Sequence, residues 1–127
     1  MTKTIKPGRG LTVTGKTRES VLSFFKNMID RRFTEAEKAL SAIRERKFTD
    51  EEYKTGYINA LDGLLLSVRS GDERDFYNRT NLNKKNLKEH KEEFKEFRKT
   101  PIRTQFDSGY FAAWSDIMQY KINVDKD

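Results

Sequence analysis

The chain contains no cysteine and only one histidine, His90, among its 127 residues. The lack of thiols excludes disulfides, cysteine nucleophiles and thiolate metal sites. His90 has no second histidine and no acid cluster at metal-ligand spacing beside it, so a zinc site is not expected. We therefore predict no metal and no cofactor, and interpret His90 as a residue at the edge of a hydrophobic core.

Long apolar runs are also missing. No segment approaches the roughly 20 residues that a membrane-spanning helix needs, and the N-terminus lacks the apolar centre of a secretion signal. We expect a cytoplasmic protein with no membrane partner. Aromatic residues nevertheless make up 12% of the chain, whereas disordered chains are poor in them. A chain of this length is expected to fold as one domain.

No complete catalytic motif is present. Gly10 and the run Gly15-Lys16-Thr17 reproduce the two ends of a nucleotide-binding loop, but no hydrophobic strand precedes them. We interpret this match as chance and predict a protein that is not an enzyme.

Apolar residues recur at three- and four-residue steps in four segments, which is the spacing of amphipathic helices. We predict helices over residues 18–46, 50–69, 84–99 and 102–121, and hence an all-α bundle of four main helices. The first has an alternative, a break at Thr34, because Thr34 and Glu37 match a capping box. The second helix is expected to begin with the capping box of Thr49 and Glu52 and to end at Gly71.

Two segments of the chain resemble each other. Residues 52–66 align without a gap to residues 105–119, with Gly, Tyr and Ala shared at aligned positions. The small residues fall on one helix face in each copy: Gly56, Ala60 and Gly63 in the first, and Gly109 and Ala113, followed by Asp116, in the second. Glycine within a helix costs about 1 kcal/mol relative to alanine, so a compensating close contact is expected. We predict that the two helices pack at this seam; a ligand, partner or dimer surface is the alternative.

The net charge of +6 is unevenly distributed. Residues 1–18 hold five basic and no acidic residues, and residues 80–103 hold eight basic and four acidic ones. We predict a flexible basic arm over residues 1–17, rich in Gly and Thr, before a helical domain over residues 18–127. The predicted phosphate contacts are Lys3, Lys6, Arg9, Lys16, Arg18, Lys84, Lys85, Lys88, Lys91, Lys95, Arg98, Lys99 and Arg103. A solvated terminus and a salt-bridged helix face are the alternative interpretations.

A short motif lies at the head of the first predicted helix. In residues 18–26, Val21, Phe24 and Phe25 stand at the spacing of one aliphatic and two aromatic residues, with Arg18 three positions before Val21. This resembles the sliding-clamp-binding peptide of flap endonucleases, DNA ligases and uracil-DNA glycosylases, which has Gln where this chain has Arg18. The resemblance implies a clamp-binding partner through these three apolar residues, which are equally explained as core.

These observations favour a small basic accessory protein that binds nucleic acid or a ribonucleoprotein, with RNA favoured over DNA. Binding is expected through the phosphate backbone, because no set of side chains suggests base-specific contacts. The alternative is a helical protein–protein adaptor or homodimer, acting through the repeated helices or the clamp-binding motif.

Overall fold

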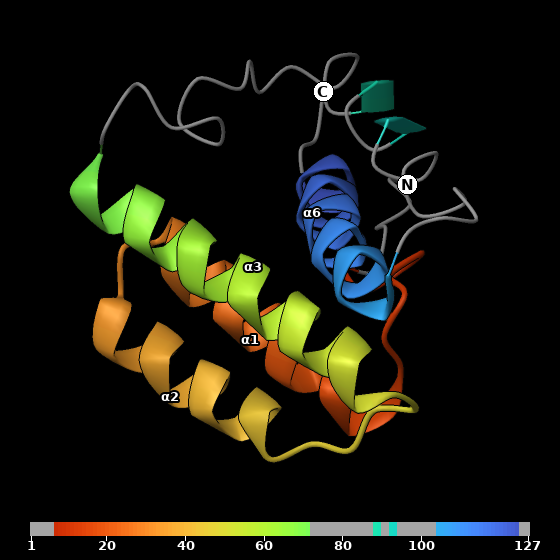
Figure 1. Cartoon of the computed structure of the whole chain (residues 1–127). Helices are drawn as coiled ribbons and strands as arrows, with labels where there is room; N and C mark the ends of the chain where they lie inside the picture. Colours follow the sequence, from red (N-terminus) through yellow and green to blue (C-terminus); the bar gives the residue numbers. More distant parts are fainter. Residues whose placement is uncertain (1–6, 72–87, 90–91, 94–103, 125–127) are drawn as a thin grey trace.

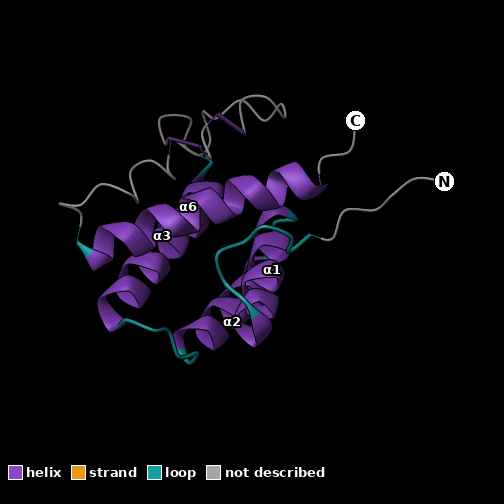
Figure 2. Cartoon of the chain, turned by 90° about the vertical axis from the view of Figure 1, so that its right-hand side faces the viewer, coloured by secondary structure: helices purple, strands orange, loops and turns teal. Residues whose placement is uncertain are grey.

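The computed structural model describes residues 7–71, 88–89, 92–93 and 104–124. These residues form four α-helices and no strand: α1 (Gly15–Ile29), α2 (Phe33–Arg44), α3 (Glu51–Ser70) and α6 (Gln105–Val124). The all-α prediction is confirmed for this part of the chain (Figure 2). The predicted helix over 84–99 lies mostly outside the described residues, and its four described positions, Lys88, Glu89, Glu92 and Glu93, are helical and exposed.

The first predicted helix is two helices. The structure ends α1 at Ile29 and begins α2 at Phe33, so the prediction of one helix over 18–46 is wrong. The cause is Arg31, whose φ of 61° is left-handed and cannot continue an α-helix. Its guanidinium donates to the carbonyl of Val68 at 3.0 Å, which fixes the turn against α3. The alternative break at Thr34 is close, but the chain turns two residues earlier and Arg32 occupies the N-cap position.

The two helices form an antiparallel hairpin with its apolar faces turned inward (Figure 1). The buried side chains of α1 are Val21, Phe24, Phe25 and Met28, and those of α2 are Ala36, Ala39, Leu40 and Ile43. One uninterrupted apolar stripe in the sequence therefore folds back on itself across the turn. This is the reason that spacing alone failed to locate the break.

The ends of α3 follow local sequence signals. Asp50, and not the predicted Thr49, is the N-cap, and its carboxylate accepts a 2.9 Å hydrogen bond from the amide of Tyr53. At the other end Gly71 adopts a left-handed φ of 68°, which confirms the predicted glycine stop. α6 begins similarly, with the Thr104 hydroxyl accepting from the amide of Asp107.

The backbones of α3 and α6 approach each other closely at two glycines. A methyl group at Gly56 would overlap the main-chain oxygen of Phe106, and one at Gly109 would overlap that of Tyr53. The two contacts are reciprocal, because each glycine meets the residue that lies three positions before the other glycine. Gly63 does not take part: it is exposed, and no heavy atom comes within 4 Å of a Cβ built there.

The segment before α1 differs from the predicted free arm. Leu11 and Val13 are buried at 6% and 8% exposure, and the Asn123 amide donates to the carbonyls of Pro7 at 2.9 Å and Arg9 at 2.7 Å. Residues 7–14 therefore pack against α6, and Lys16 and Thr17 already belong to α1. Two isolated apolar residues show no helical period, so their burial could not be predicted from the pattern of the chain. Residues 1–6 of the predicted arm lie outside the described residues.

None of the helices in the described part of the chain combines the length and the apolar character that crossing a membrane requires.

Candidate functional site

A buried carboxylate organises the side of the bundle where the N-terminal segment meets α3 and α6. Asp116 is 1% exposed and accepts hydrogen bonds from the Thr12 amide at 2.9 Å, the Thr12 hydroxyl at 2.6 Å and the Tyr57 hydroxyl at 2.7 Å. Three donors stabilise the ionised form of a carboxylate in a buried position. Asp116 thus holds residues 7–14 to both helices.

Tyr57 is the buried partner of this carboxylate. Burial raises the pKa of the Tyr57 hydroxyl well above its usual value, and the charge of Asp116, the hydrogen bond to Asp116 and nearby Tyr53 add to the rise. The hydroxyl therefore keeps its proton and remains a donor throughout the neutral range. Because neither side chain reaches the surface, the pair supports the site and does not contact a ligand.

Beside this network lies a hollow of about 490 Å³, which we call the threonine cleft. It is lined by Thr12, Val13, Thr14, Thr17, Lys47, Phe48, Thr49, Asp50, Tyr53 and Gln105. The volume falls within the usual range for ligand sites. Thr12 connects the cleft directly to Asp116.

Three helices begin at the threonine cleft. Thr14 is the N-cap of α1, Asp50 is the N-cap of α3, and Gln105 is the first residue of α6. Main-chain N–H groups at helix starts carry a partial positive charge. The first turn of α1 holds no acidic residue, whereas α3 and α6 each begin with at least one.

Several polar side chains of the cleft are free to bind. Those of Thr14, Thr17, Lys47, Thr49 and Gln105 make no hydrogen bond or ion pair within the described residues. Thr14 does not even cap its own helix, although it stands at the N-cap position. The cleft therefore offers hydroxyl groups and one ammonium group to a ligand.

One wall of the cleft is aromatic. Phe48 and Tyr53 are half-buried, with ring centroids 6.5 Å apart, and the Phe48 ring lies 5.7 Å from that of Tyr57 beneath it. Flat apolar rings together with hydroxyl and ammonium groups in one hollow suit a ligand with a planar ring and an anionic group.

The predicted phosphate contacts fall into three groups. Arg9 and Lys16 are exposed and make no ion pair within the described residues, and Lys88 is exposed. Arg18 instead donates from Nε to the carbonyl of Val13 at 2.9 Å, which holds the N-terminal segment. The following predicted contacts, like His90, lie outside the described residues: Lys3, Lys6, Lys84, Lys85, Lys91, Lys95, Arg98, Lys99 and Arg103.

The residues of the clamp-binding motif are not accessible. Val21, Phe24 and Phe25 are all 0% exposed, and Phe25 packs on Tyr120 with 5.4 Å between ring centroids. In this chain the three residues have the motif's spacing because they lie on the face of α1 that points into the core. A partner could reach these side chains only by unfolding α1.

The small-residue seam is likewise occupied within the chain. Gly56, Ala60, Gly109 and Ala113 are buried, the glycines against the facing main chain. They are therefore not available to a ligand, a partner or a second copy of the chain. Gly63, on the exposed side of α3, is the one member of the predicted seam outside this contact.

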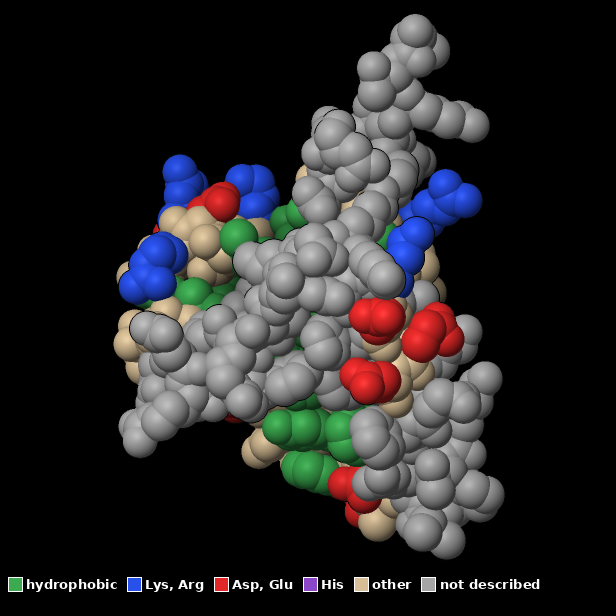
Figure 3. Space-filling view, turned by 90° about the horizontal axis from the view of Figure 1, so that it is seen from above, with side chains coloured by type: hydrophobic (Ala, Val, Ile, Leu, Met, Phe, Trp, Pro, Cys, Tyr) green, Lys and Arg blue, Asp and Glu red, His purple; other side chains and the backbone are tan. Residues whose placement is uncertain are grey.

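Sequence reasoning missed the cleft and a second cationic group. Arg31 and Arg69 lie over the Phe33 ring, at 5.0 and 5.3 Å from its centroid, and exposed Arg32 follows Arg31 in the chain. Figure 3 shows Lys and Arg side chains gathered at the left of the view, where α3 ends in Figure 1. Arg31 and Arg69 are engaged with Val68 and Glu37, so they stabilise the turn.

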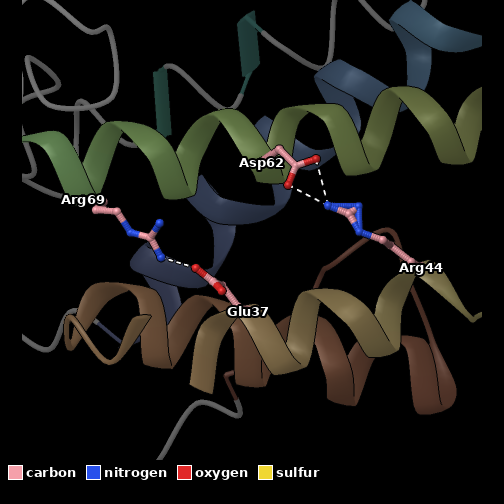
Figure 4. A network of polar contacts seen from close by, with 4 residues as sticks. All are labelled: Glu37, Arg44, Asp62 and Arg69. Carbon is pink, nitrogen blue, oxygen red and sulfur yellow. Dashed lines mark hydrogen bonds and ion pairs between the residues drawn. The ribbon is translucent and has the colours of Figure 1, made fainter. Parts of the chain in front are cut away.

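Two ion pairs join α2 and α3, and the helix that supplies the arginine differs between them (Figure 4). Arg44 of α2 pairs with Asp62 of α3 at 2.8 Å, and Arg69 of α3 pairs with Glu37 of α2. These four residues border a shallow hollow of about 330 Å³. Its charges are satisfied within the chain, unlike those of the threonine cleft. In the described ranges, no three histidine or acidic side chains come together as metal ligands would.

Comparisons of the chain with protein-family models, with curated proteins and with solved structures gave no match.

Proposed function

We propose that the protein is a non-enzymatic, cytoplasmic accessory protein that binds RNA, alone or in a ribonucleoprotein, through phosphate contacts around the threonine cleft. The observation that carries the proposal is the set of exposed cations at the cleft and in the adjoining chain, Arg9, Lys16 and Lys47. None of them makes an ion pair within the described residues.

Unpaired cations suit a polyanion for two reasons. Each phosphate that a Lys or Arg neutralises releases counterions, which gives a favourable entropy at low salt. No intramolecular ion pair has to be broken first, in contrast to Arg44 or Arg69. The hydroxyl groups of Thr14, Thr17 and Thr49 add neutral donors of the kind that contact phosphate oxygens.

The threonine cleft lacks the arrangement expected for acid–base catalysis. Its one carboxylate, Asp50, is the N-cap of α3 and is already bonded to the amide of Tyr53. The buried pair of Asp116 and Tyr57 serves the N-terminal segment. Binding without chemistry is therefore the function that we assign to the site.

The test is fluorescence anisotropy with a labelled 20-nucleotide RNA over a series of salt concentrations. The wild-type protein should bind at low salt, with an affinity that falls steeply as salt rises. The triple variant Arg9→Gln/Lys16→Gln/Lys47→Gln should bind more weakly, and its log–log salt slope should be shallower by about 2 units, as expected for three lost single-strand phosphate contacts.

A matched control separates the site from the overall charge. Lys26→Gln/Arg32→Gln/Lys38→Gln removes the same number of charges from exposed positions on α1, α2 and the turn between them. It should leave the slope nearly unchanged. Equal weakening by both triple variants would refute the location, and undetectable RNA and DNA binding at low salt would refute the function.

A further inference from the structure

The hollow shape of the threonine cleft bears on which form of nucleic acid fits it. The cleft is a hollow of about 490 Å³ on the surface of the bundle, at the level of Thr17, Lys47 and Tyr53. A protein that reads a duplex inserts a helix or ribbon into a groove. A hollow does the opposite, because it can only admit a group that projects from the nucleic acid. Unpaired nucleotides can project in this way, whereas the bases of a duplex are stacked inside.

The lining of the cleft combines the two kinds of group that the two ends of a nucleotide would contact. Phe48 and Tyr53 supply flat ring surface, and bases of any sequence stack on aromatic side chains. Lys47 and the hydroxyl groups of Thr14 and Thr49, which have no partner within the described residues, supply donors for a phosphate.

Asp50 adds a hydrogen-bond acceptor to the lining of the cleft. One of its carboxylate oxygens, Oδ1, accepts from the amide of Tyr53, and no bond within the described residues uses the other. A carboxylate repels a phosphate but accepts from a ribose hydroxyl or a base amino group. A simple anion such as free phosphate would use Lys47 and the threonines and leave both Asp50 and the aromatic wall without a role.

We infer that the threonine cleft holds one unpaired nucleotide of a single strand, with its base on Phe48 and its phosphate on Lys47 and the threonine hydroxyls. This inference rests on the proposed function and names the form of nucleic acid that the site takes. A duplex would meet only the exposed cations and would leave the cleft unused.

The test compares a single-stranded oligouridine RNA, a single-stranded DNA of equal length and an RNA duplex by anisotropy at one salt concentration. Wild-type protein should bind the single strands roughly tenfold more tightly than the duplex, as expected for one stacked base. Phe48→Leu should remove most of that preference while retaining duplex binding. Phe33→Leu, which changes a half-buried ring at the start of α2, should leave the preference unchanged.

Two further measurements keep the test decisive if Phe48→Leu fails to fold. Thr14→Val/Thr49→Val removes two hydroxyl groups at nearly constant shape and should weaken single-strand binding about threefold to tenfold. In amide NMR spectra of the wild-type protein, oligouridine should shift the signals of Thr14, Thr17, Lys47 and Thr49 more than those of α2.

The outcomes separate this inference from the proposed function. Equal affinity for single strand and duplex, with Phe48→Leu unchanged, would overturn the single-strand inference and leave phosphate binding in place. Loss of all RNA and DNA binding at low salt would overturn both. Saturable binding of uridine monophosphate without binding of any oligonucleotide would also overturn the inference, since the ligand would then be a free nucleotide.

Discussion

The hydroxyl of Tyr57 donates a 2.7 Å hydrogen bond to the carboxylate of Asp116, and both side chains are completely or almost completely buried. This bond links α3 to α6, and Asp116 extends the link to the N-terminal segment through Thr12. Since Thr12 also lines the threonine cleft, the buried pair positions one wall of the proposed binding site.

Removing the Tyr57 hydroxyl should destabilise the protein. Tyr57→Phe deletes one hydrogen bond to a charged group, which is worth about 1.5–3 kcal/mol, and leaves the ring in place. Chemical denaturation followed by circular dichroism would measure the loss. Tyr110→Phe is the control, because the Tyr110 hydroxyl makes no hydrogen bond within the described residues; its effect should stay within about 0.5 kcal/mol. Equal effects of the two changes would contradict the assigned role.

The same pair should make stability depend on alkaline pH. The pKa of Tyr57 is raised in the folded protein, so above about pH 10 the unfolded chain loses a proton that the folded chain keeps. The contribution of Tyr57 is therefore fully present below pH 10 and declines as the pH rises above it.

The measurement is the difference in unfolding free energy between wild-type protein and Tyr57→Phe at several pH values. This difference should be constant up to about pH 9.5 and shrink at higher pH. Tyr120, whose pKa is raised by burial and by Asp30, and Lys121, whose pKa is lowered by burial, are present in both proteins and cancel. A difference that grows with pH would contradict the prediction.

Replacing glycine by alanine should lower the stability of the protein at two positions in α3 and α6 and raise it at a third. Gly56→Ala and Gly109→Ala force a methyl group against the facing main chain, and each should cost roughly 3 kcal/mol or more. Gly63→Ala places its methyl group in open space and should stabilise the helix by up to about 1 kcal/mol. Thermal and urea denaturation of the three variants would test this. Stabilisation at position 56 or 109 would refute the close crossing.

The ion pairs between α2 and α3 should contribute little. Arg44 and Asp62 have side chains that are 46% and 48% exposed, and exposed pairs contribute about 0.2–1 kcal/mol. A double-mutant cycle with Arg44→Gln and Asp62→Asn should give a coupling energy in that range, decreasing in 1 M salt. A coupling above about 2 kcal/mol would show that the pair is shielded from solvent.

Local signals in the sequence predicted the helices better than their arrangement. The apolar spacing located α3 and α6 to within a few residues, and Gly71 marked the end of α3 because only a residue that tolerates positive φ stops a helix in this way. The spacing gave no sign of the turn at Arg31, since the apolar stripe continues through it. The guanidinium of Arg31 finds its acceptor on α3, which is 37 residues away in the chain.

The candidate site was only partly predictable. Arg9 and Lys16 follow from charge, because a segment of bases without acids cannot pair them locally. No sequence pattern marked Lys47 and Phe48 as binding residues. They line the cleft because residues 12–17 and Gln105 fold next to them. For Phe24 and Phe25 the sequence suggested a partner-binding motif where the structure has core residues. A motif defined by apolar spacing has the same pattern as a helix face that points into the core, and only burial distinguishes the two.

The sequence by itself determined that the chain forms helices, where α3 and α6 begin and end to within a few residues, and that positive charge collects outside the repeated segments. These properties depend on neighbours along the chain. Only the tertiary structure decided that Gly56 and Gly109 contact the main chain of the facing helix inside the bundle. It also decided that Asp116 holds residues 7–14 in place, and that a cleft opens beside them. These depend on contacts between residues far apart in sequence, which no local pattern records.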